Sequence, residues 1–341
     1  MEVNLISDTI TKPSTAMLEA MQQARVGDDV FKDDPTVNQL EETLADYFGM
    51  EAALFFPSGT MANQTAIKIH TQPGEQLICD HYSHVFNYEG GGVSFNSGVS
   101  CKLLEGDQGR ITARQIEPAI HSPEFYHSPP TRLVCLENTT NKGGGAFYDF
   151  EEIKKIRALC DQHELGLHLD GARLWNALVE TQESPLDYGK QFDTISVCFS
   201  KGLGCPVGSA LVGSKELMNK ALRIRKVFGG GMRQSGYLAA AALFALEHHF
   251  SDLKKDHIKA KALESALKKC SFVSEVVPVH TNILIFSLAE ELNAQQFVQD
   301  MAARKIRLLS LGEGKIRLVT HRDYTDEQHH YFLEILKQFY S

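Results

Sequence analysis

The 341-residue sequence has no concentrated positive charge and no long hydrophobic run. Its 34 Lys and Arg are outnumbered by 43 Asp and Glu, which gives a formal net charge of −9. A chain of that sign is poorly suited to the phosphate backbone of a nucleic acid. No window approaches the roughly 18 uninterrupted apolar residues of a membrane-spanning helix, and no basic segment followed by an apolar one opens the chain. We therefore expect no nucleic-acid partner, no membrane insertion and no export.

Cysteine pairs and metal-ligand clusters are also missing. The seven cysteines are odd in number, contain no C-x-x-C pair and mostly lie within apolar runs, where a reduced cysteine packs as a small hydrophobe. This usage is typical of a cytoplasmic protein. The adjacent pairs His248-His249 and His329-His330 lack carboxylate or cysteine companions at ligand spacing, so we predict no metal site.

What the sequence does contain is an alternation of short apolar runs with helical stretches. The runs lie at residues 53–56, 76–79, 133–136, 166–169, 194–199 and 209–212. Strands that are apolar on both faces and are separated by helices indicate a mostly parallel sheet covered by helices on both sides. The best-marked helix begins after Asp34, has Pro35 in its first turn and ends at Gly49.

This alternation changes near residue 250. Beyond that point the pattern predicts a helix around 258–267, strands near 283–286 and 316–319, and a closing helix from Glu327. The sequence therefore predicts an α/β protein with a large domain over residues 1–249, which includes the N-terminal segment, and a smaller C-terminal α+β domain over residues 250–341.

Polar residues follow several of the apolar runs, at the strand ends where open α/β sheets bind ligands. Ser58, Gly59 and Thr60 follow the first strand and open a helix, so their backbone N–H groups and hydroxyls suit a phosphate group. An ordinary helix cap is the alternative. Asp170 ends a buried strand, where it either pairs with Arg173 or holds a protonated pyridine nitrogen of a cofactor.

A lone lysine, Lys201, follows another strand and precedes a glycine-rich turn. A lysine among apolar neighbours can become an amine nucleophile that forms a Schiff base. The order of phosphate-binding turn, strand-end aspartate and strand-end lysine resembles that of fold-type I pyridoxal 5′-phosphate enzymes. Its motifs are closer still to the low-specificity L-threonine aldolases, which belong to the β-eliminating lyase group.

The matching segments span nearly the whole chain in order. They are SDTITKPSTAMLEAM (7–21), VGDDVFKDDPTVNQLE (26–41), PSGTMAN (57–63), HVFNYEGGG (84–92), LENT (136–139), HLDGARLWNA (168–177), SKGLGCPVGSALVG (200–213), GGGMRQSG (229–236) and IRLVTH (316–321). The resemblance implies that Lys201 holds pyridoxal phosphate as a Schiff base and that Asp170 pairs with the pyridine nitrogen. It also implies that Ser58–Thr60 hold the phosphate and that His84 stacks on the ring.

On the substrate side, the resemblance places Arg173 and Arg317 near the substrate carboxylate and the cofactor, with Ser7 at the same end, and it makes Arg173 a cofactor contact as well. A planar guanidinium can bind a carboxylate through two parallel hydrogen bonds, so at least one of the arginines is a plausible clamp. Lys226 and Arg233 match a glycine-rich loop of the family that can reach the site of an adjacent subunit. The family assembles as tetramers of paired dimers with sites at the interfaces, which implies a homotetramer here.

The resemblance further implies cleavage of L-threonine or L-allo-threonine to glycine and acetaldehyde. His127 matches a second family histidine that can contact the substrate hydroxyl, and an incidental loop histidine is the alternative. His84, His127 or an ordered water could be the base that removes the hydroxyl proton. Two positions depart from the family pattern, Ile6 where an arginine is common and Cys205 where a threonine is usual.

Two other functions stay open at this stage. Another reaction on the same scaffold, such as β-elimination or racemisation of an amino acid, would use the same lysine and aspartate. A nucleotide-dependent enzyme is a weaker alternative, because the glycine runs at 90–92, 143–145 and 229–231 match neither a G-x-G-x-x-G turn after a first strand nor a G-x-x-x-x-G-K-[ST] loop.

Overall fold

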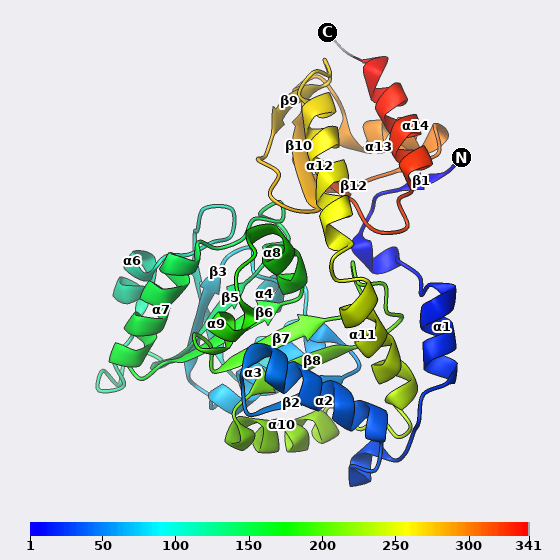
Figure 1. Cartoon of the computed structure of the whole chain (residues 1–341). Coiled ribbons are helices and arrows are strands. Elements are labelled where there is room, and N and C mark those ends of the chain that lie inside the picture. The colour runs from blue at the N-terminus through cyan, green and yellow to red at the C-terminus, as the bar shows by residue number, and fades with distance from the viewer. Residues whose placement is uncertain (340–341) are drawn as a thin grey trace.

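The computed structural model describes residues 1–339 and shows a large part and a small part, each built around a sheet (Figure 1). The large sheet has the order β2-β8-β7-β6-β5-β3-β4, in which β8 runs antiparallel to both neighbours and the other pairs are parallel. Its strands are β2 (Ala52–Phe56), β3 (Gln76–Asp80), β4 (Ser100–Leu104), β5 (Thr131–Glu137), β6 (Gly166–Gly171), β7 (Thr194–Cys198) and β8 (Ser209–Gly213). The predicted α/β class with a mostly parallel sheet is confirmed.

Helices cover both faces of this sheet. They are α1 (Thr15–Gln22), α2 (Pro35–Phe48), α3 (Gly59–His70), α4 (His84–Asn87), α5 (Gly92–Ser97), α6 (Ala113–Ile116), α7 (Phe150–Gln162), α8 (Leu174–Thr181), α9 (Pro185–Gly189), α10 (Lys215–Val227) and α11 (Gly236–His248). The predicted boundaries of α2 are confirmed, because Asp34 accepts the backbone N–H groups of Thr36 and Val37, and Gly49 ends the helix with a φ of 62°.

The largest hydrophobic core lies between the sheet and the helices α2, α7, α8 and α11. Trp175, Phe48 and Phe199 are among its fully or almost fully buried side chains. The indole N–H of Trp175 donates to the carbonyl of Cys198 at 2.9 Å, so its polar atom is satisfied at the end of β7. Complete burial of one such side chain contributes on the order of 2–3 kcal/mol. This core fixes the strand ends that carry the candidate site.

The small part is an antiparallel sheet with a separate core. Its strands follow the order β12 (Leu309–Gly312), β13 (Lys315–Val319), β10 (Ile283–Leu288) and β9 (Val273–Val276), and its helices are α12 (Leu253–Leu267), α13 (Ala294–Ala303) and α14 (Asp326–Lys337). The N-terminal strand β1 (Val3–Asn4) pairs with β11 (Ile306–Arg307), and Val3 and Leu5 belong to this second core. The N-terminal strand thus lies with the small part, and the division at residue 250 stays a prediction.

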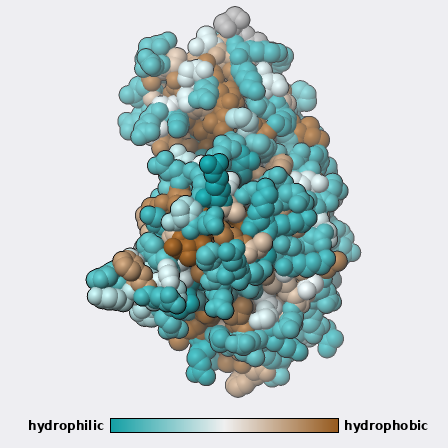
Figure 2. Space-filling model, turned by 90° about the vertical axis from the view of Figure 1, so that its left-hand side faces the viewer, coloured by the Kyte–Doolittle hydropathy of each residue, from teal (hydrophilic) through white to brown (hydrophobic). Residues whose placement is uncertain are grey.

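The two parts meet above the carboxyl ends of the central strands (Figure 1). A view from the side of α6 and α7 shows a hollow between the small part at the top and the large part below it, with hydrophobic patches among mostly hydrophilic residues (Figure 2). None of the helices within residues 1–339 has the length and the apolar character needed to cross a membrane.

Candidate functional site

A cavity of about 260 Å³ lies at the carboxyl ends of β6 and β7, beside the start of α3. Its lining includes every residue predicted to contact the cofactor except Arg173; the lining residues are Pro57, Ser58, Gly59, Thr60, Asn63, His84, Glu89, Asp170, Ala172, Cys198, Ser200, Lys201, Pro206 and Val207. The structure therefore brings together the phosphate-binding turn, the aspartate and the lysine. Their individual roles stay predictions.

The first turn of α3 forms one side of the cavity. The Ser58 hydroxyl caps the helix by accepting the backbone N–H of Met61 at 3.2 Å, so the helix cap, which is the alternative interpretation of this turn, is present. A Cβ on Gly59 would lie 2.6 Å from Sγ of Cys198, which leaves room only for glycine where the turn approaches β7. The remaining N–H groups at this end and the positive end of the helix dipole suit an anion.

Asp170 lies at the end of β6 and is 3% exposed. Its carboxylate accepts the side-chain N–H of Asn63 at 2.9 Å and the backbone N–H of Ala172 at 3.1 Å. The alternative in which Asp170 pairs with Arg173 is wrong, because Arg173 is bound to a different carboxylate. Asp170 is thus a buried acceptor that faces the cavity and is held by neutral donors.

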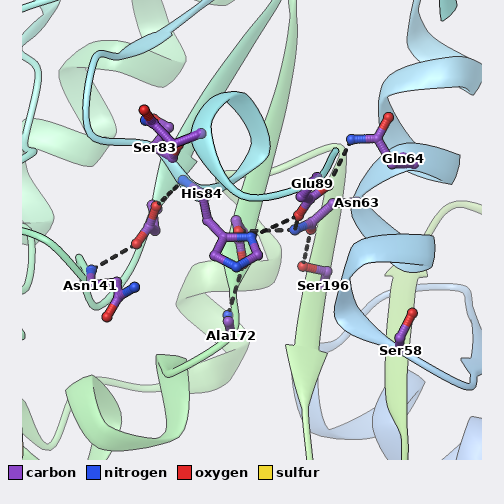
Figure 3. Close-up of polar contacts among 12 residues, drawn as sticks. Ser58, Asn63, Gln64, Ser83, His84, Glu89, Asn141, Ala172 and Ser196 are labelled. Carbon is purple, nitrogen blue, oxygen red and sulfur yellow. Dashed lines mark hydrogen bonds and ion pairs between the residues drawn. The ribbon is translucent and has the colours of Figure 1, made fainter. Parts of the chain in front are cut away.

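His84 opens the short helix α4 and contacts two buried glutamates (Figure 3). Its backbone N–H donates to Glu137 at 2.7 Å, and its Nδ1 lies 3.0 Å from the Glu89 carboxylate, which can only accept. Burial by itself lowers the pKa of His84. The hydrogen bond to Glu89 and the charges of Asp170, Glu89 and Glu137 outweigh burial and raise the pKa above its usual value.

Glu137 lies at the end of β5, beneath His84. Both of its carboxylate oxygens accept backbone N–H groups at 2.7 Å, one from His84 and one from Asn141. Burial, and next the charge of Asp170, raise the pKa of Glu137 to about 7. Sequence reasoning missed Glu137, Glu89 and Asn63 as site residues. The first follows an apolar run as Asp170 does, so its position at a strand end was an available signal.

A second cavity of about 300 Å³ adjoins the first and shares His84 and Lys201 with it. It is lined by Ser7, Thr9, His84, Tyr88, Asn141, Lys142, Arg173, Lys201, Leu309, Leu311 and Arg317. The predicted substrate-side residues Ser7, Arg173 and Arg317 are therefore brought together. Among the described residues that line this cavity there is no carboxylate, so the cavity suits an anionic ligand.

The two arginines of this second cavity have different partners. Arg173 donates from Nε and Nη2 to both oxygens of Asp8, at 2.8 and 2.7 Å, and both side chains are buried. Arg317 instead donates to the side-chain oxygen of Asn141 at 2.7 Å and to the carbonyl of Ile6 at 3.1 Å. Nε of Arg317 is buried without a hydrogen-bond partner within the described chain. Of the two arginines, Arg317 is thus the one that has no carboxylate among its hydrogen-bond partners.

Three predicted residues lie away from both cavities. His127 is in an exposed loop beside the rings of Phe125 and Tyr126. Arg233 pairs with Asp28 at 2.8 Å, and Lys226 lines a separate surface hollow. A single chain therefore does not bring these three residues to Lys201, and their roles stay predictions.

The geometry agrees with comparisons to known proteins. A solved structure of a threonine aldolase from Leishmania major superposes with a TM-score of 0.86 at 22% identity, covering 98% of this chain and 99% of that one. The fold is that of the fold-type I pyridoxal-phosphate enzymes. A family described as beta-eliminating lyase matches residues 4–291. The chain belongs to the beta-eliminating lyase family.

Curated relatives match over nearly the full length of the chain. A low-specificity L-threonine aldolase from Arabidopsis thaliana is 40% identical over 344 residues, covering 98% of this chain and 96% of the relative. A low specificity L-threonine aldolase from Escherichia coli K12 is 39% identical over 327 residues, covering 96% of each chain. The resemblance that the motifs indicated is confirmed, and the chain is a lyase.

The first cavity also fits pyridoxal phosphate. The crowded glycine at the start of α3 leaves a backbone cradle for the phosphate, and Asp170 offers a buried carboxylate to a cationic nitrogen. Lys201 lines both cavities, as an amine that bonds the cofactor and faces the substrate must. The residues present therefore match the three chemical groups of the cofactor.

Proposed function

We propose that this chain cleaves L-threonine and L-allo-threonine to glycine and acetaldehyde with pyridoxal 5′-phosphate bound to Lys201. The observation that carries the proposal is that Lys201, Asp170 and the start of α3 line one cavity, which adjoins a second cavity lined by Arg317 and without a lining carboxylate. The 40% and 39% identity to L-threonine aldolases from two organisms, over nearly the full length of the chain, supports the choice of reaction.

Each residue has a distinct part in the proposed reaction. The start of α3 binds the cofactor phosphate, Asp170 keeps the pyridine nitrogen protonated, and Arg317 orients the substrate through its carboxylate. When bound, the cofactor supplies an electron sink for the pair released as the Cα–Cβ bond breaks. The products balance because the β-hydroxyl loses its proton to become the aldehyde, and Cα gains one to become glycine.

His84 is the candidate base within a single chain. Of the two predicted histidines, it lines both cavities, whereas His127 lies on the exposed loop. Because Nδ1 of His84 donates to Glu89, its Nε2 is the nitrogen that accepts a proton. Since the pKa of His84 is raised, the base form becomes the major one at a higher pH than for an unperturbed histidine.

The test combines spectroscopy with product analysis. The purified protein is expected to show a visible absorbance band with pyridoxal phosphate and to release glycine and acetaldehyde from L-threonine or L-allo-threonine. Lys201→Ala is expected to lose both the band and the activity, because the covalent attachment is lost. Ammonia with a keto acid, or inversion at Cα, would reassign the chain to elimination or racemisation. A chain that takes up no cofactor would refute the proposal.

We also propose that the chain forms a homotetramer in the cytoplasm, built as a dimer of dimers with sites at the interfaces. Large apolar side chains that are exposed in the single chain support the assembly, among them Phe95 at 89%, Tyr126 at 85% and Val227 at 74% exposure. Tyr126 neighbours His127, and Val227 neighbours Lys226. All seven cysteines are free thiols, which supports the proposed cytoplasmic location. Analytical ultracentrifugation tests the assembly, and a monomer would contradict it.

A further inference from the structure

Two buried carboxylates lie side by side in the lining of the first cavity. Atoms of Glu89, Asp170 and His84 that could serve as ligands all lie within 4.8 Å of one another. Glu89 is 6% exposed and Asp170 is 3% exposed, so both need donors to offset their lost hydration. The amide of Asn63 bridges them, because its Nδ2 donates to Asp170 and to Glu89, each at 2.9 Å (Figure 3).

The orientation of the Asn63 amide is fixed from its other side. Its oxygen lies 2.6 Å from the hydroxyl of Ser196 and 3.2 Å from Nε2 of His168. A serine hydroxyl donates to an amide oxygen, and an imidazole N–H does the same. If the amide were flipped, its NH₂ would meet these two groups and its oxygen would meet two carboxylates. Asn63 therefore has one favourable orientation, in which both hydrogens face the carboxylates.

Behind Asn63, a chain of hydrogen bonds leads away from the first cavity through His168, Thr194 and His70. Nδ1 of His168 lies 2.9 Å from the hydroxyl of Thr194, and that hydroxyl lies 3.0 Å from Nε2 of His70. Burial lowers the pKa of both His168 and His70 to about 4, so both rings are neutral near pH 7. With Nε2 of His168 donating to Asn63, its Nδ1 must accept from Thr194, which in turn accepts from His70.

The placement of these residues keeps the chain of donors rigid. Asn63 and His70 are seven residues apart on α3, so they project from the same face of the helix. Thr194 and Ser196 are two residues apart on β7 and point to one face of the sheet, as His168 and Asp170 do on β6. One helix and two neighbouring strands thus supply every member.

We infer that Asn63 is a positioning residue for the cofactor, held in one orientation by Ser196 and by the chain His70–Thr194–His168. One of its amide hydrogens holds the Asp170 carboxylate aimed at the ring nitrogen, while the other holds Glu89 against His84. This inference rests on the role proposed for Asp170. Ser196, His168, Thr194 and His70 do not line the first cavity, whereas Asn63 does. These four residues therefore act on the cofactor only through the amide of Asn63.

The test compares Asn63→Leu with Gln64→Met in the full-length protein. Gln64 is the next residue of α3, is equally buried at 2% exposure, and donates to Glu89 at 2.6 Å but not to Asp170. We expect Asn63→Leu to weaken pyridoxal phosphate binding about tenfold or more, because the hydrogen bond that positions the Asp170 carboxylate is lost. We expect Gln64→Met to change it less than about threefold.

A second readout separates positioning from a merely structural role. NMR of isotope-labelled ring nitrogen reports whether the bound cofactor is protonated there, and we expect Asn63→Leu to reduce that protonation and Gln64→Met to preserve it. If Asn63→Leu only lowers the melting temperature of the cofactor-free protein, and leaves affinity and ring protonation as in the wild type, the inference is wrong.

A milder variant covers the case in which Asn63→Leu does not fold. Ser196→Ala removes one of the two donors to the Asn63 oxygen, and we expect the same two changes in the same direction, with an affinity loss of about threefold. Unchanged affinity and protonation in Ser196→Ala would then overturn the inference. A wild-type protein that binds no pyridoxal phosphate would defeat the proposed function itself, which is a different outcome from either variant result.

Discussion

At the scale of single residues, the two arginines that line the second cavity, Arg317 and Arg173, are expected to have different roles, one in substrate binding and the other in stability. Arg317 has neutral partners only, so we predict that Arg317→Lys raises the KM for L-threonine about tenfold or more, because an ammonium cannot make two parallel bonds to a carboxylate. The cofactor affinity is expected to stay as in the wild type. Steady-state kinetics give the KM, and spectrophotometric titration gives the affinity.

The matched control for this prediction is Arg307→Lys, because Arg307 lies in the same small part with an exposed side chain, 3.8 Å from Glu2. Its KM is expected to equal that of the wild type. An unchanged KM in Arg317→Lys would show that the substrate carboxylate binds elsewhere.

Arg173 is expected to matter for stability, because it forms a buried pair with Asp8. Asp8→Ala leaves a buried guanidinium without its partner, and we predict a loss of about 3–5 kcal/mol in the free energy of unfolding. Burial opposes ionisation of Asp8, but the charge of Arg173 lowers its pKa well below the usual range. The stabilisation is therefore present above the unfolded pKa and is lost as the pH falls.

Denaturant unfolding at several pH values measures both effects of Asp8→Ala. The control is Glu216→Ala, since Glu216 and Lys220 lie at the same 2.7 Å but are exposed, and little change is expected there. Equal destabilisation by the two variants would contradict the role given to the buried pair.

At the scale of elements, the start of α3 depends on the contact between Gly59 and β7. We predict that Gly59→Ala displaces this turn and weakens pyridoxal phosphate binding about tenfold, because a Cβ would lie 2.6 Å from Sγ of Cys198 and overpacking of that kind costs about 1–3 kcal/mol. The double variant Gly59→Ala with Cys198→Ala is expected to recover most of the affinity. Cofactor titration of both variants decides this, and a double variant no better than the single one would refute it.

Helix α12 contains a buried carboxyl group, Asp256, which is 3% exposed. Burial raises the pKa of Asp256 to about 7 from 3.8, so the folded state favours its neutral form. Stability is therefore lost as the pH rises from about 4 to about 7, by at most about 4 kcal/mol. We predict that Asp256→Asn becomes more stable than the wild type as the pH rises over this range. Above about pH 7 the difference in stability is expected to stay constant. Melting temperatures against pH test this, and a difference independent of pH would contradict it.

Elements with strong local signals were predicted well, and elements without them were missed. The bounds of α2 followed from Asp34, Pro35 and Gly49, which act within the helix itself. Strand β4 was missed because it lies at the sheet edge, where Ser100 and Lys102 are exposed and no continuous apolar run forms. The two-residue strands β1 and β11 carry no periodicity at all, and they exist only because they pair with each other.

The residues of the candidate site can likewise be divided into those that the sequence predicts and those that it does not. Lys201 and Asp170 could be predicted because Asp170 lies at the end of the buried strand β6 and Lys201 follows the buried strand β7. The neighbourhood of a strand end is set by the sheet. Asn63 could not be predicted, because a polar residue within a helix usually faces solvent. Its partner Asp170 is 107 residues away in the sequence, and only the packing of α3 on β6 and β7 brings the two together.

At the scale of the whole molecule, the second cavity is lined by residues from both the large part and the small part. Arg317 and Leu309 come from the small sheet, whereas Arg173 and Lys201 come from the large part. The hydrogen bond from Arg317 to Asn141 crosses between them. A movement of one part against the other would therefore change the distance between Arg317 and Lys201, so the relative position of the two parts sets the shape of this cavity.

The pairing of β1 with β11 also has a consequence for synthesis on the ribosome. Residues 3 and 4 leave the ribosome long before their partners at 306 and 307 are made. The large sheet, whose strands end at Gly213, can assemble while translation continues, because domains generally fold as units from the N-terminal side. The small core closes only after residues 306 and 307 are made, so a nascent chain released early would carry a finished first cavity beside an unfinished second cavity.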